Sequence, residues 1–149
     1  MAVVYLGLGT NLGDKEANLN NAIYEIEELV GTVLSISSFY ETEPWGFTSF
    51  NMFLNAAIGV ETELTPGELL RIVQDIENDM GRESKTENGI YEDRVIDIDI
   101  LLYGDKVVQT QRLQIPHPLI AEREFVLTPL KEIAPDVVHT LLGMKIKDL

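Results

Sequence analysis

Hydrophobic and polar positions follow two periods along this chain, and each period predicts a different kind of element. Residues 3–8 and 53–60 are short apolar runs of the kind that form buried strands. Residues 32–40 alternate between apolar and polar positions, as in a strand with one face toward solvent. We therefore predict strands over these three segments.

Two other segments repeat apolar residues every three or four positions, which predicts amphipathic helices. The first runs from Asp14, a good N-cap, to Gly31, and the second runs from Thr65 to Gly81. Pro66 at the first helical position and Glu68 three residues after Thr65 complete a capping box at the second helix. The pattern therefore predicts the ends of both helices as well as their buried faces.

A further strand is predicted over Val95–Leu102, where isoleucines and aspartates alternate. Successive side chains on a strand point to opposite faces, so Asp97 and Asp99 share one face at a spacing of about 7 Å. Aspartate is depleted in strands, and two like charges side by side repel each other. The pair is either part of a solvated face or a site for a hard cation such as Mg²⁺, which prefers carboxylate oxygens.

The order strand, helix, strand, strand, helix, strand (βαββαβ) is that of a ferredoxin-like α+β fold, an antiparallel sheet with both helices on one face. The other face is then left for something else. Beyond Lys106 we expect a C-terminal elaboration with a short strand at Arg112–Ile115, a turn at 116–118 and a helix near 128–133. Since the sequence has no linker and no repeat, residues 1–149 are predicted to form a single domain.

The chain is acidic, because 25 Asp and Glu against 11 Lys and Arg give a net charge of −14. Such a surface repels nucleic acid and anionic lipid, so neither is an expected partner. No apolar run approaches the roughly 18 residues of a membrane span. The N-terminus lacks a basic leader, and cysteine is absent. These features predict a cytoplasmic protein without disulfides or thiolate metal sites.

The few arginines are concentrated around the aspartate pair in the sequence. Arg82, Arg94, Arg112 and Arg123 lie on both sides of the predicted aspartate strand, and only Arg71 lies elsewhere. The planar fork of arginine suits phosphate oxygens. This clustering favours a site that binds Mg²⁺ and a polyphosphate together over a merely solvated face.

The glycines of GLGTNLGD, near the end of the first predicted strand, do not form a phosphate-binding loop. Gly7, Gly9 and Gly13 lack the spacing of G-x-G-x-x-G, and no G-K-[ST] follows them. Glycine at a strand end more often allows an unusual turn or a close approach of the backbone. We expect that role here.

Other candidate groups have structural explanations beside the functional ones. Arg82 and Lys85 could complement the dipole at the end of the second helix, and His117 could be a turn residue between prolines. Trp45, in the sequence PWGF, could belong to a local core or to a flap over a flat aromatic ligand. Asn55 could bond the edge of such a ring or cap the strand ladder. The residues alone leave these alternatives open.

Several motifs together resemble one family. They are LGLGTNLGD at 6–14, SSFYETEP at 37–44, FLNAA at 53–57, GR at 81–82, DRVIDIDILLYG at 93–104, IPHP at 115–118 and REFVLTPL at 123–130. In this combination the sequence resembles the 6-hydroxymethyl-7,8-dihydropterin pyrophosphokinases of folate biosynthesis. The resemblance covers almost the whole chain, and the aspartate-strand motif with the IPHP and REFVL motifs is its most specific part.

The resemblance implies an ATP-dependent diphosphokinase that moves pyrophosphate from ATP to the hydroxymethyl group of the dihydropterin and releases AMP. It implies ATP as co-substrate, two Mg²⁺ ions held by Asp97 and Asp99, and phosphate contacts from Arg82 and Arg94 during catalysis. The positions that match the nucleotide site are Gln74, Glu77, Ile100, Arg112, His117 and Arg123. Those that match the pterin pocket and its flap are Thr42, Trp45, Phe53, Asn55 and Phe125.

The sequence departs from the family pattern mainly in the polar loop 83–93. Ser84 stands where many members have a second arginine, and Tyr91 stands where a tryptophan closes over the site. In the pterin flap, Glu43 and Trp45 replace smaller residues. These differences bear on loop closure, which we expect only when nucleotide and pterin are both bound. They leave the chemistry of the aspartate pair unchanged.

Two rival functions come from other classes. One is a non-catalytic acidic module that binds a small ligand or a metal, and the arginine cluster speaks against it. The other is a different Mg²⁺-dependent nucleotidyl or phosphoryl transferase. Formation of AMP, as opposed to ADP or free pyrophosphate, would separate pyrophosphate transfer from both rivals. The expected partners are ATP and the dihydropterin, and we expect a monomer.

Overall fold

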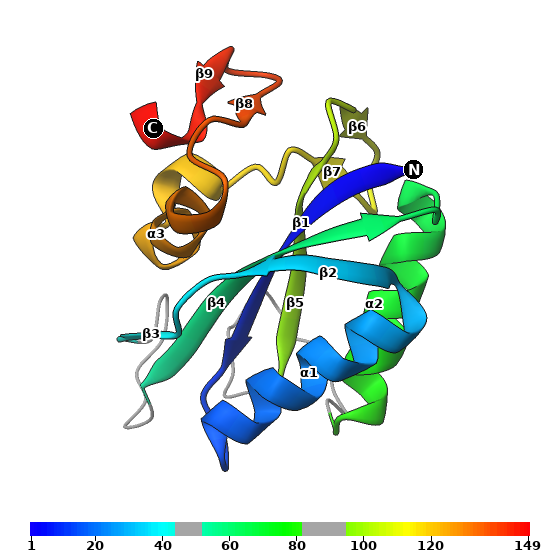
Figure 1. The fold of residues 1–149 in the computed structure, drawn as a ribbon, viewed down its shortest axis with the longest axis vertical. Helices are drawn as coiled ribbons and strands as arrows, with labels where there is room; N and C mark the ends of the chain where they lie inside the picture. Colours follow the sequence, from blue (N-terminus) through cyan, green and yellow to red (C-terminus); the bar gives the residue numbers. More distant parts are fainter. Residues whose placement is uncertain (44–51, 82–94) are drawn as a thin grey trace.

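The centre of the computed structural model, which describes residues 1–43, 52–81 and 95–149, is a five-stranded antiparallel sheet. Four strands lie side by side in the order β2 (Gly31–Ile36), β4 (Phe53–Thr62), β1 (Ala2–Thr10) and β5 (Asp97–Tyr103). The short β3 (Tyr40–Thr42) pairs with the first residues of β4. Helices lie on both sides of this sheet (Figure 1). The predicted α+β class is confirmed.

The two long helices, α1 (Lys15–Leu29) and α2 (Pro66–Asp79), lie on the same face of the sheet (Figure 1). Between them and the strands is the main core, formed by Leu19, Ala22 and Ile26 of α1, Leu69, Val73 and Ile76 of α2, and Val4, Leu6, Leu8, Ile58, Val60, Ile98 and Ile100 of the sheet. These strand residues alternate in sequence, so every second position of each strand is left for the opposite face.

On that opposite face lies α3 (Glu124–Ile133). Val126, Leu127 and Leu130 of this helix form a second, smaller core with Ala57 of β4 and Leu101 of β5. Because α3 is short, it covers only part of the face. The remaining part, at the Asp97 end of β5, carries polar side chains.

The other C-terminal elements are short. They are β6 (Val108–Gln109), β7 (Gln114–Ile115), a 3₁₀ helix at Ile120–Glu122, β8 (Val138–His139), β9 (Met144–Lys145) and a 3₁₀ helix at Ile146–Asp148. After β7 the Ile115–Pro116 peptide bond is cis, and the backbone N–H of His117 donates to the carbonyl of Leu101 at 2.9 Å. This bond attaches the 116–118 turn to β5.

The predicted helix starts are confirmed. The Asp14 side chain accepts a hydrogen bond from the N–H of Ala17 at 3.1 Å. Thr65 and Glu68 exchange the two bonds of a capping box, with Pro66 at the first helical position. At the other end of α2, Gly81 has a φ of 104°, which favours glycine and ends the helix.

Some predicted boundaries are wrong. The end of the first helix is not among them, because this helix ends at Leu29 with Val30 as C-cap and Gly31 directly after it. Gly31 also opens β2, where an added Cβ would lie 2.0 Å from the carbonyl oxygen of Glu61. The strand predicted over 32–40 is divided into β2 and β3. The helix predicted near 128–133 begins earlier, at Glu124. Among the described residues, no helix combines the length and the apolar character that crossing a bilayer requires.

Candidate active site

The polar part of the sheet face beside α3 is organised by the register of β4, β1 and β5. Asp97 lies opposite Gly9, and Gly9 lies opposite Asn55, so these three residues form one row across the sheet. In the next row Asp99 lies opposite Gly7. Both aspartates are half-buried and lie on the same face, as their alternation with isoleucine predicts. The row structure places each carboxylate beside a residue without a side chain.

Gly7 and Gly9 leave the sheet beneath this region without side chains at their two positions. An added Cβ at Gly9 would lie 3.1 Å from Oδ1 of Asn55, and one at Gly7 would lie 3.4 Å from Cδ1 of Leu101. Both glycines lie inside β1, so of the two expected roles, a turn or a close approach, the turn does not apply to them. Gly13, with a φ of 68°, has the turn conformation. Gly7 and Gly9 instead leave space above the sheet.

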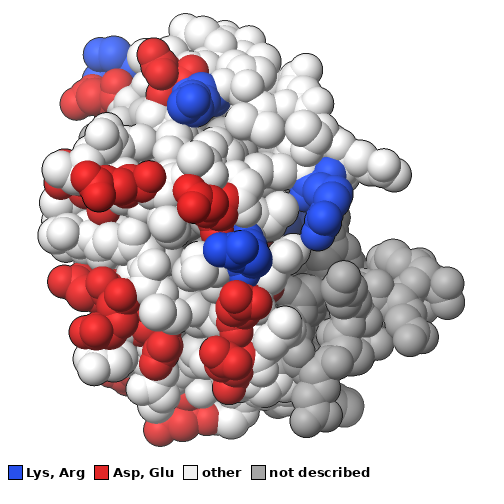
Figure 2. Space-filling view, turned by 90° about the vertical axis from the view of Figure 1, so that its right-hand side faces the viewer, with Lys and Arg blue, Asp and Glu red and all other residues white. Residues whose placement is uncertain are grey.

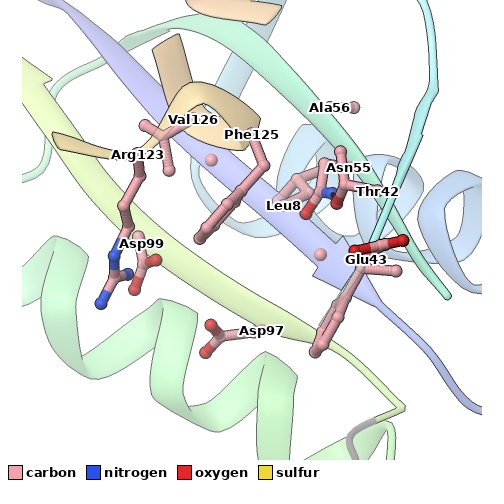
Figure 3. A pocket seen from close by; sticks show the side chains of 13 residues that line it. Leu8, Thr42, Glu43, Asn55, Ala56, Asp97, Asp99, Arg123, Phe125 and Val126 are labelled. Carbon is pink, nitrogen blue, oxygen red and sulfur yellow. Dashed lines mark hydrogen bonds between the residues drawn. The ribbon is translucent and has the colours of Figure 1, made fainter. Parts of the chain in front are cut away.

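That space is a cavity of about 600 Å³, including the part open to solvent, between the sheet, β3 and α3. Figure 3 shows the side chains that surround it. Its lining is Gly7, Leu8, Gly9, Thr42, Glu43, Phe53, Asn55, Ala56, Asp97, Asp99, Arg123, Phe125 and Val126. The cavity thus brings the predicted pterin residues within the described chain together with both aspartates.

Asn55 is the polar group most deeply placed in this cavity. Its side chain is buried, with 5% exposure, and its Nδ2 donates to the hydroxyl oxygen of Thr42 at 2.6 Å. This bond fixes the amide, so its Oδ1 faces the backbone of Gly9. An immobilised amide beside two half-buried phenyl rings, Phe53 and Phe125, can recognise the edge of a flat heterocycle while the rings contact its faces.

Arg123 enters the cavity from the residue that precedes α3. Its side chain is 7% exposed, and the guanidinium carbon lies 5.5 Å from the centroid of the Phe125 ring. Figure 3 shows the guanidinium beside the carboxylate of Asp99. A buried cation next to the aspartates offsets part of their repulsion and offers donors to an anionic ligand.

A second hollow lies on the other side of the aspartate pair, between α2, β5 and the 116–118 turn. Its lining is Leu70, Val73, Gln74, Glu77, Asp97, Ile98, Asp99, His117, Leu119 and Arg123. A neighbouring hollow adds Ile100 and Arg112. All six predicted nucleotide-site residues therefore line this pair of hollows. Asp97, Asp99 and Arg123 belong to the cavity and to the second hollow at once.

Glu77 is buried in this hollow, with 4% exposure. Its Oε2 accepts a hydrogen bond from the backbone N–H of Ile98 at 2.8 Å. Ile98 lies between the two aspartates on an outer strand of the sheet. One oxygen of Glu77 therefore holds β5, in addition to any contact that this residue makes with a nucleotide.

His117 accepts a hydrogen bond at Nδ1 from the backbone N–H of Leu119 at 3.2 Å. When neutral, the ring therefore carries its proton on Nε2. Burial and then the nearby Arg123 lower the pKa of His117 below 6.5, and Asp97 opposes this shift. A neutral imidazole with a fixed tautomer is available at neutral pH as a hydrogen-bond donor to a ligand.

The arrangement fits Mg²⁺ better than zinc. Within residues 1–43, 52–81 and 95–149, no group of three or more histidine, aspartate or glutamate side chains could hold a metal ion by itself. Mg²⁺ is typically held by one or two carboxylates, with waters and substrate phosphates completing its octahedron. Asp97 and Asp99, with open space above their glycine neighbours, match that requirement.

The chain as a whole carries a net charge of −14, which repels an anion at long range. Acidic side chains spread over the face shown in Figure 2, and the fewer lysines and arginines stand among them. An anionic ligand is therefore attracted by the local cations at the site and repelled by the rest of the molecule.

Several predicted residues lie outside the described residues: Trp45, Arg82, Arg94 and the loop 83–93 with Ser84 and Tyr91. Their predicted roles stay predictions. Conversely, the sequence interpretation missed five cavity-lining residues, which are Gly7, Leu8, Gly9, Ala56 and Val126. The two glycines had a detectable signal, because they alternate along a strand beside a predicted charged face.

Comparisons with known proteins identify the family of this chain. The family model described as 7,8-dihydro-6-hydroxymethylpterin-pyrophosphokinase (HPPK) matches residues 5–135. The chain belongs to this family. Relatives within it include two proteins named 2-amino-4-hydroxy-6-hydroxymethyldihydropteridine pyrophosphokinase. The protein from Porphyromonas gingivalis is 48% identical over 136 residues, 91% of this chain and 92% of that protein. The protein from Aquifex aeolicus is 41% identical over 148 residues, 99% of this chain and 90% of that protein.

The fold of the HPPK family is also recognised in solved structures. The crystal structure of Plasmodium falciparum wild-type HPPK-DHPS with pteroate superposes with a TM-score of 0.78 at 16% sequence identity. The match covers 99% of this chain and 43% of that longer chain. At this identity the likeness supports the fold alone.

Proposed function

We propose that this HPPK-family chain transfers pyrophosphate from ATP to the hydroxymethyl group of 6-hydroxymethyl-7,8-dihydropterin, giving AMP and the pterin diphosphate. The observation that carries the proposal is the place of Asp97 and Asp99. They stand where a cavity with aromatic walls meets a polar hollow, so a pterin in the first and a nucleotide in the second would meet at the two carboxylates.

The pterin site is assigned to the cavity beside α3. Phe53 and Phe125 would contact the faces of the bicycle, and the fixed amide of Asn55 would bond its edge with help from Thr42. The contact of Arg123 with the Phe125 ring supports the position of that ring. Trp45 stays a predicted part of the flap.

The nucleotide site is assigned to the hollows between α2, β5 and the 116–118 turn. Gln74, Glu77, Ile100, Arg112, His117 and Arg123 line them. The Nε2–H of His117 and the guanidinium of Arg123 are donors suited to phosphate oxygens. Arg82 and Arg94 are proposed to reach the phosphates from the loop that connects α2 to β5.

Asp97 and Asp99 are the residues that would hold two Mg²⁺ ions. When bound there, Mg²⁺ supplies charge neutralisation between phosphates and polarisation of the attacking hydroxyl. The protein contributes alignment: the cavity orients the hydroxymethyl group toward the β-phosphorus, and the hollow holds the α-phosphate so that AMP departs in line. No described residue needs to act as a general base in this scheme.

The strand order β2-β4-β1-β5, with α1 and α2 on one face, supports the further proposal that the fold is ferredoxin-like with a C-terminal elaboration around α3. A single domain over residues 1–149, a monomeric state and a cytoplasmic location stay predictions of the sequence.

The decisive experiment is a product analysis. The purified protein is incubated with ATP, Mg²⁺ and 6-hydroxymethyl-7,8-dihydropterin, and the nucleotide products are separated by chromatography. AMP formed in equal amount to pterin diphosphate is the expected result. ADP or free pyrophosphate would point to one of the rival transferases, and the absence of any pterin-dependent product would contradict an enzymatic role. Omission of Mg²⁺ should abolish AMP formation.

A further inference from the structure

Glu132, in the last turn of α3, joins this helix to the chain between β2 and β3. Its two carboxylate oxygens each accept from the backbone N–H of Ser38 at 3.0 Å. One of them also accepts from Ser38 Oγ at 3.2 Å, and the other accepts from the hydroxyl of Tyr40. The donors lie 94 and 92 residues away in the sequence, so the carboxylate is a long-range link.

The segment that Glu132 binds is itself fastened to the sheet. The N–H of Ser37 donates to the carbonyl of Ala57 at 2.9 Å, and the N–H of Ala57 donates back to Ser37 Oγ at 2.8 Å. Tyr40 then pairs with Asn55 in the β3–β4 register. Glu132 therefore connects α3 to β4 through a short, hydrogen-bonded stretch of chain.

Glu132 joins α3 to β3, and each of these two elements carries a residue of the cavity lining on the same face as its linking residue. Glu132 and Phe125 are seven residues apart, which on a helix is nearly two full turns, so they share a face about 10 Å apart. Tyr40 and Thr42 are two residues apart on β3, so they share a face of that strand. The carboxylate thus ties the helix that bears Phe125 to the strand that bears Thr42.

The apolar contacts of α3 do not by themselves fix this relation. Val126, Leu127 and Leu130 hold the helix on the sheet through apolar packing, which is largely non-directional. Hydrogen bonds to a charged acceptor are directional, and they are shorter and stronger than those between neutral groups. The Tyr40 hydroxyl and then the Ser38 N–H lower the pKa of Glu132, so the ionised acceptor is the form at neutral pH.

We propose that Glu132 is a positioning residue of the pterin site: it holds α3 against the β2–β3 segment and so sets the distance between Phe125 and the Thr42 wall of the cavity. This inference rests on the proposed function for the identity of the ligand. Glu132 itself lies outside the cavity lining and makes no assigned contact with a substrate.

The test separates the two Michaelis constants. In the AMP-forming assay, Glu132→Ala should raise the KM for the dihydropterin about tenfold, while the KM for ATP stays within about twofold, as expected for lost orientation of one wall only. Tyr40→Phe removes one donor with almost no change in shape and should move the same constant in the same direction. Thr128→Ala, at an exposed position of the same helix, is the matched control and should change neither constant.

A double variant sharpens the test. If Tyr40 and Glu132 act through one link, the combined change in Glu132→Ala/Tyr40→Phe should equal that of Glu132→Ala alone. An unchanged pterin KM in both single variants would overturn the proposal. So would a parallel rise of both KM values, since the loss of orientation in one wall of the pterin cavity cannot account for an equal change at the nucleotide site.

The failure of this inference can be told apart from failure of the proposed function. If the unaltered protein forms no AMP, the pyrophosphokinase assignment and the assigned pterin site are both wrong. If it forms AMP and Glu132→Ala keeps its pterin KM, only the positioning role is wrong.

Discussion

The two faces of β5 give a direct comparison of stability and chemistry within one strand. Ile98 and Ile100 face α1 and α2 and are almost completely buried in the main core. Asp97 and Asp99 face the cavity beside α3 and remain half-buried. One face buries apolar surface and lowers the free energy of the folded chain. The other places like charges together, which raises it.

The comparison shows how a pattern of period two can serve two purposes with the same backbone. The core face fixes the position of β5, and the fixed strand then presents its carboxylates at a set spacing. The like charges of such a site lower the stability of the folded chain, and the burial of apolar side chains elsewhere compensates for this loss. Substitutions of the aspartates should therefore lower the activity and leave the stability intact, whereas truncations on the core face should lower the stability and leave the KM values unchanged.

The largest effect is expected from Asp97→Ala. Loss of one of the two carboxylates that we propose hold Mg²⁺ should lower turnover by about three orders of magnitude, corresponding to several kcal/mol of transition-state stabilisation. The melting temperature should stay the same or rise, because a repulsion between neighbours is removed. Steady-state kinetics and calorimetry measure the two quantities. Asp105→Ala, at an exposed acidic position just past β5, is the control, and a merely tenfold loss for Asp97→Ala would contradict the assignment.

The opposite signature is expected from Leu6→Ala on the core face of β1. Leu6 is fully buried, and truncation of such a side chain costs about 2–5 kcal/mol of unfolding free energy. Urea titration measures this loss, while the folded fraction should keep both KM values. Leu34→Ala, at a site that is 54% exposed, should cost less than about 0.5 kcal/mol. A large change of the pterin KM in Leu6→Ala would show that the two faces are not separable.

A smaller effect distinguishes the two glycines of the cavity floor. In Gly9→Ala the new methyl group meets Oδ1 of Asn55 at 3.1 Å, so the amide must shift, and we expect the pterin KM to rise about tenfold. In Gly7→Ala the nearest atom is at 3.4 Å, an ordinary contact, and the rise should be smaller. Since both substitutions replace glycine inside a strand, the backbone contribution is matched. Equal effects would mean that Asn55 does not orient the pterin.

The smallest effects concern the two histidines. Each accepts a hydrogen bond at Nδ1 from a backbone N–H, but only His117 lines the hollow beside the aspartates. His139, in β8, accepts a hydrogen bond at Nδ1 from the N–H of Leu142 at 3.1 Å, and burial lowers its pKa below 6.5. The unfolded chain therefore binds the proton first, and stability should fall as the pH drops through 6.5. In His139→Gln, urea titrations at pH 7.5 and pH 5.5 should differ less than in the unaltered protein.

His117 provides the matched case at the site. His117→Gln should raise the KM for ATP, because this residue lines the hollow that we propose binds the nucleotide, whereas His139→Gln should leave it unchanged. If both variants altered the KM for ATP equally, the assigned nucleotide site would need revision.

The sequence was most informative where one local interaction decides the structure. Asp14 and the Thr65–Glu68 box fix helix starts through bonds that span three residues, and the alternation at Asp97 and Asp99 fixes a face through backbone geometry alone. These features need no knowledge of the rest of the fold. They were predicted correctly for that reason.

Boundaries that depend on distant contacts were predicted less well. The strand over 32–40 is interrupted because Ser37 bonds to Ala57 and turns the chain toward Tyr40. The helix predicted near 128–133 begins four residues earlier, at Glu124, and Pro129 lies buried inside it. The link made by Glu132 could not be predicted, since its donors are more than 90 residues away.

The two edge strands of the sheet, β5 and β2, differ in how well they are protected against pairing with a strand of another molecule. Glu77 accepts from the N–H of Ile98, and the N–H of His117 donates to the carbonyl of Leu101, so groups that could bond to a foreign strand are already occupied. On β2 the N–H of Val33 is bonded to Glu27, but Leu34 and Ile36 are exposed. In concentrated solution, intermolecular strand addition should therefore begin at β2, and a lysine at position 36 would be the simplest safeguard against aggregation.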